Sequence, residues 1–207
     1  KDYTQVIIEE ADRLRNLVDR LVGSRKPPEL KEINIHEVLE RVRNLIAAET
    51  LGKGIKLYCD YDPSLPAVLA DSEKMIQALL NLLRNSLQAL TSPKIDHQLG
   101  EIILRTRISR NITIASKFYK LAVAIEIIDN GPGIPQEISE TIFYPMISGR
   151  PDGSGLGLPI SHGIVTQHGG MIECDSKPGE TKFTVTMPIK RNSKFSTSKV
   201  QQVNELK

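Results

Sequence analysis

The chain of 207 residues contains no tryptophan, only four phenylalanines and only five tyrosines. So few aromatic side chains argue against a surface that stacks the bases of single-stranded nucleic acid. The formal net charge is only +2, so the basic excess of a general nucleic-acid binder is missing too. No stretch approaches about 18 consecutive apolar residues, and a membrane-spanning helix is therefore not expected.

Cysteine is also scarce. Cys59 and Cys174 lie far apart, and the sequence has no Cys-x-x-Cys pair and no zinc-ligand spacing. Two ordinary core thiols in a reducing compartment are the expected interpretation. No signal peptide is visible, which favours a cytoplasmic location, although Lys1 opens inside a helical pattern and the chain looks like a piece of something longer.

Residues 2–22 predict a helix with apolar side chains at heptad spacing, namely Ile7, Ala11, Leu14, Val18 and Leu21. A seam this narrow is typical of helices that pair in a bundle or coiled coil, so we expect a homodimer through the seam of helix 2–22. A helix that packs on its own domain is the alternative. Pro27-Pro28 ends the helix, which predicts a linker over 28–32, a main domain over 33–190 and a flexible tail over 191–207.

The main domain mixes helices and strands without regular βαβ alternation. Helices are expected from the cap Asn34 to Thr50, with Leu45 on the apolar side, from the cap Asp71 to Leu90, and over Gly155–His168. Strands are expected over Ile55–Tyr61, Val68–Leu69, Glu101–Ile108, Tyr119–Ile128, Gly170–Cys174 and Lys182–Met187, with a hairpin loop at Arg110-Asn111. This order predicts an α+β fold, a two-layer sandwich with a mixed, mainly antiparallel sheet and helices on one face.

The helix over 71–90 carries an unusual polar stripe opposite its apolar half. The stripe consists of Gln77, Asn81, Arg84, Asn85 and Gln88. A solvated helix face usually carries Glu and Lys, whereas this one is rich in amides. Amide oxygens suit a magnesium ion that already sits on anionic phosphates, and Asn81 and Asn85 at i, i+4 can reach one ion. A metal site and a plain surface remain equally good interpretations of the stripe alone.

A first glycine box, Asp-Asn-Gly-Pro-Gly-Ile-Pro at 129–135, follows an apolar strand. Gly131 and Gly133 let the backbone approach a planar ligand, because no Cβ stands in the way. The Asp129 carboxylate only accepts hydrogen bonds, so it can accept from the exocyclic amine of adenine and repels the carbonyl oxygen of guanine. An ordinary turn is the alternative.

A second glycine box, Gly-Ser-Gly-Leu-Gly-Leu at 153–158, leads into a helix. Backbone amides at a helix N-terminus form an anion site, although a lone G-x-G-x-G is weak evidence. Residues 136–152 lie between the boxes, and their polar, glycine-bearing half, with Ser-Gly-Arg-Pro at 148–151, predicts a mobile flap from which Arg150 can reach phosphates. A solvated loop arginine is the alternative for Arg150.

Together these boxes resemble the ATP-binding domain shared by sensor histidine kinases, DNA gyrase, Hsp90-type chaperones and MutL. The run Asn-Leu-Leu-Arg-Asn at 81–85 is similar to the N box of that family, and residues 129–133 and 153–158 are similar to its two G boxes. Phe-Tyr-Pro-Met at 143–146 resembles the F box of kinases. The likeness covers about residues 33–190 and implies ATP and Mg²⁺ as cofactors.

A narrower resemblance is to the nitrogen-regulation sensor histidine kinases of the NtrB type. It rests on the helix segment 9–21, on Asp-Tyr-Asp-Pro-Ser-Leu-Pro at 60–66 and on residues 143–150. It implies a cytoplasmic dimer that phosphorylates its own histidine on a dimerisation domain, of which residues 1–27 would be the second helix. It also implies an NtrC-type response regulator as phosphoryl acceptor and a PII-type signalling protein as regulator.

The family's site residues transfer to matching positions here. The resemblance implies Asn85 as the principal Mg²⁺ ligand, with Asn81 as a possible second, and Asn81 and Arg150 as catalytic residues. The implied ATP-binding set is Asn81, Arg84, Asn85, Asp129, Gly131, Gly133, Ile134, Arg150, Gly153, Ser154, Gly155, Leu156, Gly157, Leu158 and Thr184.

One departure limits the activity of this chain. The phosphoacceptor box of the family, His-Glu followed by Asn-Pro, is absent around His36, His97, His162 and His168. Phosphoryl transfer to a histidine outside the chain is therefore expected. A nucleotide-sensing module without transfer is the second hypothesis. A gyrase-type or chaperone-type ATPase is the third, ranked last because position 81 holds an amide, which cannot act as a base, where that branch has a glutamate.

Overall fold

The computed structural model describes residues 27–91, 100–149 and 153–189. In chain order the elements are β1 (Lys31–Ile33), α2 (Ile35–Leu51), β2 (Lys56–Asp60), β3 (Val68–Ala70), α3 (Ser72–Leu90), β4 (Glu101–Ile114), β5 (Lys117–Asp129), α4 (Gln136–Ser139), α5 (Gly157–Gln167), β6 (Met171–Lys177) and β7 (Glu180–Pro188). The predicted helix 2–22, its dimer seam and the tail 191–207 lie outside the described residues.

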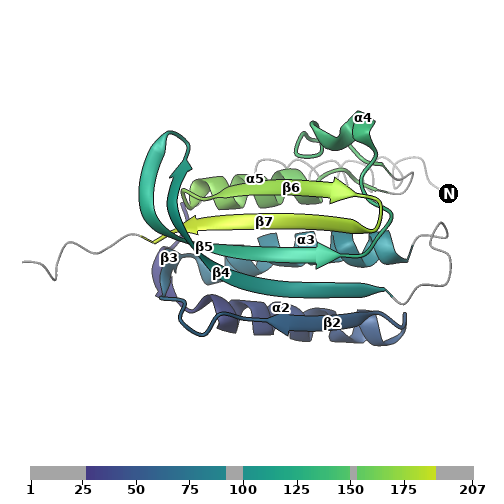
Figure 1. Cartoon of the computed structure of the whole chain (residues 1–207), viewed down its shortest axis with the longest axis horizontal. Helices are drawn as coiled ribbons and strands as arrows, with labels where there is room; N and C mark the ends of the chain where they lie inside the picture. The colour runs from purple at the N-terminus through teal and green to yellow at the C-terminus, as the bar shows by residue number, and fades with distance from the viewer. Residues whose placement is uncertain (1–26, 92–99, 150–152, 190–207) are drawn as a thin grey trace, which may run out of the picture.

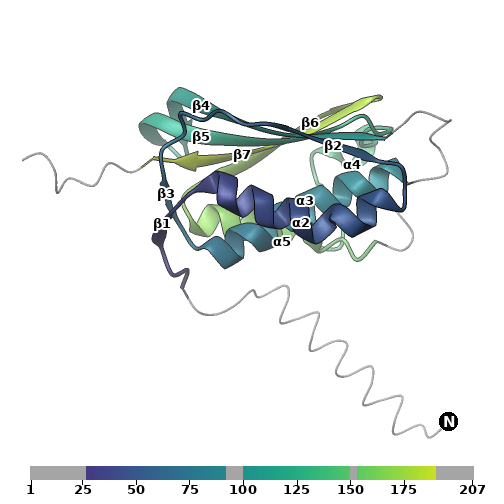
Figure 2. The same cartoon turned by 90° about the horizontal axis from the view of Figure 1, so that it is seen from below.

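The main sheet has five strands in the order β2-β4-β5-β7-β6. Only β2 and β4 pair in parallel, and the other neighbours are antiparallel. Helices α2, α3 and α5 lie together on one face of this sheet, as Figure 2 shows, and Figure 1 shows the sheet in front of them. The predicted two-layer α+β sandwich is confirmed.

The core lies between these two layers and explains the apolar pattern of the strands. Alternate residues of β4, β5 and β7 face the helices and are buried, including Ile102, Leu104, Ile125, Ile127, Phe183 and Val185. Helix α3 contributes Met75, Leu79, Leu82, Leu83 and Leu87 to the same core. The opposite face of the sheet carries the intervening polar residues, among them the ion pair of Arg105 with Asp60.

Helix α2 begins where the sequence predicts, because the Asn34 side chain accepts a hydrogen bond from the His36 backbone N at 2.9 Å. One predicted core residue of this helix is wrong. Leu45 is 56 % exposed, whereas Val38, Leu39, Val42 and Ile46 are buried. Leu45 lies at the edge of that stripe, where the sheet does not cover it.

The hairpin of β4 and β5 corrects the prediction of a loop at Arg110-Asn111. Arg110 pairs with Leu121 and Ile112 with Tyr119, so the strands continue through the polar segment. The turn lies at Ala115-Ser116, where both residues have positive φ, 45° and 65°. Two consecutive residues of positive φ match the twist of the flanking strands, which explains why a two-residue turn forms there without glycine.

Pairing of β1 with β3 ties the start of the described chain to the domain. Strand β1 begins at Lys31, inside the range 28–32 that the sequence assigns to a linker, and the Glu29 backbone N donates to Asp71 Oδ2 at 3.0 Å. The assignment of residues 1–27 to a separate domain stays a prediction. None of the described helices is both long and apolar enough to cross a membrane.

Candidate functional site

Helix α3 connects the three motifs. Its N-terminus is fixed by Asp71, whose Oδ1 accepts from the backbone N of Glu73 and Lys74 at 3.1 and 3.2 Å. Its apolar half packs in the core, and the amide stripe lies on the other side. Asn81 and Asn85 are half-buried in this stripe, whereas Gln77 and Gln88 are exposed. Another element therefore covers Asn81 and Asn85 in part and leaves Gln77 and Gln88 exposed.

That element is the start of α5, which carries the second glycine box. Asn81 Nδ2 donates to Gly157 O at 3.4 Å, and a β-carbon built on Gly157 would lie 3.9 Å from both Asn81 Cβ and Asn85 Nδ2. One turn further on, the buried Ser161 Oγ lies 3.0 Å from the carbonyl oxygens of Ala78 and Gly157. These contacts hold the second box on the asparagine helix.

The first glycine box reaches the same helix one turn beyond Asn85. A β-carbon built on Gly131 would lie 3.4 Å from Ala89 Cβ and only 2.7 Å from Asp129 Oδ1. Any larger residue at position 131 would collide with the carboxylate. Positions 81, 85 and 89 of α3 thus bring the amide stripe and both boxes into one cluster, although residues 136–152 separate the boxes in the sequence.

Asp129 ends β5 with its side chain on the helix side of the sheet, and it is only 2 % exposed. Its Oδ1 accepts from the Gly131 backbone N at 3.0 Å, which fixes the carboxylate at the mouth of the first box. A buried carboxylate held in this way presents an acceptor and no donor. That chemistry matches a ligand with an amine at this point.

The sequence missed the neighbour of Asp129. Thr181 of β7 lies directly opposite Asp129 in the sheet and is 4 % exposed. The missed signal was alternation: Phe183 and Val185 face the helices, so Thr181 must face them too, and Thr184 must not. Thr184 lies on the other side of β7, and the structure does not bring it to the cluster.

Arg84 is the other expected ATP-binding residue that the structure places elsewhere. Arg84 Nη2 pairs with Glu49 Oε1 of α2 at 3.1 Å, and both side chains are largely open to solvent. Arg150 lies outside the described residues. Gly153 and Ser154 are exposed, Leu156 is buried and Leu158 is half-buried at the start of α5.

The start of α5 is left open. Helices α2 and α3 are capped by Asn34 and Asp71, but no side chain of the described residues caps α5. Leu156 N has only a long bond to Ser154 Oγ, 3.4 Å. The first amides of a helix carry partial positive charge and need acceptors, so this end is suited to an anion.

The described part of the segment between the two boxes contacts α5 and the second box. Phe143 of the F-box segment lies against His162 of α5, with ring centroids 5.5 Å apart. Met146 N donates to Gly155 O at 3.1 Å, and a β-carbon on Gly155 would lie 2.6 Å from the Met146 carbonyl carbon. Gly155 also has φ of 64°, which only glycine adopts readily. The second box therefore closes the loop that begins at Met146.

Two of the histidines are held by structural hydrogen bonds. His168 Nδ1 donates to Ile164 O at 2.7 Å, and Nε2 accepts from the Asp71 backbone N at 3.0 Å. His36, although followed by Glu37, stacks on Tyr61 and bonds to Thr106 Oγ1 at 3.0 Å. His97 lies outside the described residues. His36 and His168 therefore resemble structural residues rather than phosphoryl acceptors.

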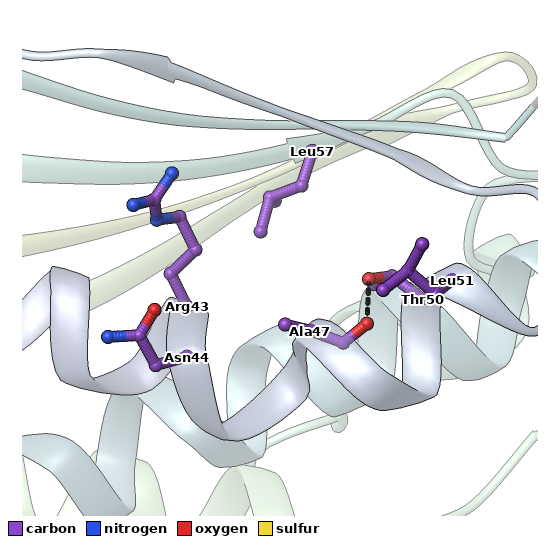
Figure 3. A pocket seen from close by; sticks show the side chains of 6 residues that line it. All are labelled: Arg43, Asn44, Ala47, Thr50, Leu51 and Leu57. Carbon is purple, nitrogen blue, oxygen red and sulfur yellow. Dashed lines mark hydrogen bonds between the residues drawn. The ribbon is translucent and has the colours of Figure 1, made fainter.

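A groove of about 320 Å³ lies elsewhere, between α2 and β2. Figure 3 shows Arg43, Asn44, Ala47, Thr50, Leu51 and Leu57 around it, with the Thr50 hydroxyl bonded to the Ala47 carbonyl of its own helix. None of the residues that the sequence assigns to nucleotide binding lines this groove. The motif cluster along α3, and not this groove, is the candidate site.

Comparison with known proteins agrees with this cluster. Residues 70–191, which include both glycine boxes and the amide stripe, match the family described as Histidine kinase-, DNA gyrase B-, and HSP90-like ATPase. The chain belongs to this ATPase family. Both cysteines are free, with Cys59 exposed and Cys174 half-buried. The described residues contain no group of His, Cys, Asp and Glu that could hold a metal ion.

Several relatives that match most of the chain are histidine kinases. The Sensory histidine kinase/phosphatase NtrB of Escherichia coli O157:H7 is 50 % identical over 190 residues, covering 92 % of this chain and 53 % of that protein. The chain thus spans about half the length of the curated relatives it matches. The catalytic domain of the histidine kinase ThkA has a TM-score of 0.63 and 25 % identity, over 77 % of this chain and 95 % of that one. ThkA in complex with the response regulator protein TrrA has a TM-score of 0.64 and 25 % identity, over 92 % and 51 %.

Proposed function

We propose that this chain is the catalytic ATP-binding part of a two-component sensor histidine kinase in nitrogen regulation. It transfers the γ-phosphoryl group of ATP to a histidine outside the chain, for relay to a response regulator. The observation that carries the proposal is the meeting of Asn81, Asn85 and both glycine boxes along α3. The similarity to NtrB proteins over 92 % of the chain supports the assignment to nitrogen regulation.

The base end of the nucleotide is assigned to the first box. Asp129 accepts from the adenine amine and disfavours guanine, whose carbonyl oxygen would face a carboxylate. Gly131 and Gly133 are assigned to line the base, with Ile134 beside it. A β-carbon on Gly131 would lie 2.7 Å from Asp129 Oδ1, so only glycine leaves this carboxylate its room. ATP and GTP should therefore differ strongly in affinity.

The phosphate end is assigned to the second box. Gly153, Ser154, Gly155, Leu156, Gly157 and Leu158 offer backbone amides at the uncapped start of α5. Arg150 from the flap adds a positive charge. These groups hold and orient the phosphates, and such positioning and charge neutralisation make up most of the protein's part in phosphoryl transfer.

Mg²⁺ is assigned to Asn85, with Asn81 as a possible second ligand. Both amides are half-buried beside Gly157, which is where the phosphates would lie. Magnesium is bound in such sites by one or two protein oxygens together with phosphate oxygens and water, so two amides suffice. Bound there, the ion would neutralise phosphate charge.

Transfer rather than hydrolysis follows from the residue at position 81. The Asn81 amide donates to Gly157 O and cannot remove a proton from water. A neutral histidine already has a free lone pair and needs little help from a base. The site thus favours a histidine acceptor over water.

The partners follow from the same proposal. An NtrC-type response regulator is the expected acceptor downstream, and the complex of the similar kinase ThkA with TrrA supports a partner of this class. A PII-type regulator, a homodimer through the seam of helix 2–22 and a cytoplasmic location remain predictions from the sequence.

Binding is tested by nucleotide-dependent thermal shift with Mg²⁺. Wild-type protein should be stabilised by ATP and much less by GTP. Asp129→Asn and Asn85→Ala should abolish most of the ATP shift. Full ATP shifts in both variants would reject the assigned site.

Transfer is tested by adding a separate dimerisation domain that carries the phosphoacceptor histidine, together with ATP labelled on the γ-phosphate. Label should appear on that domain and be acid-labile, as expected for phosphohistidine. Nucleotide binding without label on the domain would instead identify a nucleotide-sensing module, and steady phosphate release without label would identify an ATPase.

A further inference from the structure

A chain of hydrogen bonds joins the first glycine box to two strands that lie behind it. The Ile134 backbone N donates to Ser176 Oγ at 2.8 Å, and Ser176 Oγ lies 3.0 Å from Thr181 Oγ1. Ser176 of β6 is the direct cross-strand partner of Thr181 in β7, and Thr181 is in turn the partner of Asp129 in β5. Ser176 thus connects the loop over the base with the strand end that carries the carboxylate.

The turn between β6 and β7 holds the same loop by its backbone. Gly179 N donates to Gly131 O at 2.9 Å. A β-carbon built on Gly133 would lie 2.9 Å from both the carbonyl carbon and the oxygen of Lys177, so the loop and the turn are in close contact. The Ser176 hydroxyl is the side-chain bond within this contact.

The number of hydrogen bonds that the Ser176 hydroxyl can accept and donate defines its role. Its oxygen accepts from Ile134 N–H, and its single hydroxyl hydrogen can then be donated to Thr181, or it can accept a second bond from Thr181. Thr181 is 4 % exposed and has little access to water. Loss of the Ser176 hydroxyl would leave Ile134 N–H and the Thr181 hydroxyl without this partner, and the loop would no longer be fixed relative to Asp129.

We propose that Ser176 is a positioning residue for adenine recognition, which acts by holding residues 131–134 at a fixed distance from Asp129 and Thr181. This inference rests on the proposed function, because it assumes that Asp129 reads the adenine amine. Ser176 itself does not have to touch the nucleotide. Its effect should therefore appear in discrimination between bases, and not in the phosphate contacts at α5.

The test is calorimetric titration of the whole chain with Mg²⁺ and two nucleotides, ATP and the purine ribonucleoside triphosphate that lacks the 6-amino group. Ser176→Ala should weaken ATP binding about 5- to 10-fold, the effect of one lost hydrogen bond. It should weaken binding of the amine-free nucleotide less than about twofold, because Asp129 has no amine to meet there. Ser176→Thr, which keeps the hydroxyl, should stay within about twofold of wild type for both nucleotides.

Thr113→Ala is the matched control, because it removes an exposed hydroxyl near the hairpin end of β4, whereas Asp129 pairs with Ile102 at the other end of that strand. It should change neither affinity. If Ser176→Ala does not fold, Ser176→Cys, which has a similar volume and a weak donor, provides the same comparison. Equal losses for the two nucleotides in Ser176→Ala, or no loss for ATP while wild type binds it tightly, would overturn the role of Ser176 alone. A wild-type chain that does not bind ATP would overturn the proposed function as well.

Discussion

Helices α3 and α5 lie side by side but begin in opposite ways. At the start of α3, Asp71 accepts from three backbone N–H groups, those of Glu29, Glu73 and Lys74. At the start of α5, the N-cap position is Leu156, and no described side chain makes a capping hydrogen bond to the helix. The start of α3 is thus capped, which stabilises the fold, whereas the start of α5 is open to an anion. A substitution at the start of one helix should leave the contribution of the other helix start unchanged.

The largest effect is expected from the amide next to the open end. Asn85→Ala should weaken Mg²⁺-dependent ATP binding about 10- to 100-fold, the range for an interaction with a charged group. The loss should shrink when EDTA replaces Mg²⁺ in the titration. Gln88→Ala, an exposed amide one turn further along the same stripe, should leave affinity within about twofold. Equal losses in the two variants would deny Asn85 a special role.

A smaller loss is expected when the open end is moved. Gly155→Ala forces a β-carbon against Met146 and a side chain into a left-handed conformation, which costs about 1–2 kcal/mol. ATP affinity should fall about tenfold, while adenosine affinity should hardly change, because adenosine has no phosphates. Gly163→Ala lies within α5 with no atom within 4 Å of its new β-carbon, and it should keep full affinity. Isothermal titration with both ligands checks the pair of variants.

The closed end should affect stability and not affinity. Asp71→Ala should lower the free energy of unfolding by about 1 kcal/mol at pH 7, as loss of an N-cap does, with ATP affinity of the folded protein unchanged. Burial acts to raise the pKa of the Asp71 carboxyl, but the backbone N–H groups of Glu29, Lys74 and Glu73 outweigh it, so the pKa lies below its ordinary value.

The sign of the pH dependence follows from that lowered pKa. The stabilisation by the ionised Asp71 is complete above the ordinary carboxyl pKa and is lost as the pH falls through the folded value. Urea denaturation should therefore show the gap between wild type and Asp71→Ala narrowing below about pH 4. Asp71→Asn should keep the cap at pH 7 without this pH dependence. A gap that is constant down to pH 2 would contradict the electrostatic explanation.

The smallest effect is expected from the charge that faces away from the open end. Because Arg84 pairs with Glu49 near solvent, Arg84→Ala should cost at most about 1 kcal/mol of stability and change ATP affinity less than about twofold. Glu49→Ala should behave alike, and the double variant should cost no more than either single one. A tenfold loss of affinity in Arg84→Ala alone would return Arg84 to the nucleotide site, as the sequence implied.

Much of this comparison could be predicted from the sequence because its parts are local. Asn34 and Asp71 directly precede segments of helical apolar periodicity, so the sequence identifies them as N-caps. The two glycine boxes indicate loops with backbone conformations that favour glycine. The mixed order of elements was enough for the two-layer fold. Local signals also place Phe183, Val185 and Met187 on one buried face.

The features that the sequence did not reveal depend on neighbours that are distant in the chain. The polar pair Arg110-Asn111 looks like a loop, yet pairing with β5 keeps it in a strand until Ala115. Arg84 has a partner on α2 that no helical pattern reveals. Alternation along β7 puts Thr181 and Thr184 on opposite faces, but the position of Thr181 opposite Asp129 follows only from the pairing of β5 with β7.

The most direct test of nucleotide binding by the motif cluster along α3 is a titration of the ¹⁵N-labelled chain with MgATP, followed by ¹H–¹⁵N NMR. We expect large chemical-shift changes at the amides of Gly131, Gly155, Gly157 and Leu158. The amides of Glu73 and Lys74, at the capped start of α3, should remain nearly unchanged. Shifts confined to the groove between α2 and β2, or no shifts at saturating MgATP, would contradict nucleotide binding by this cluster.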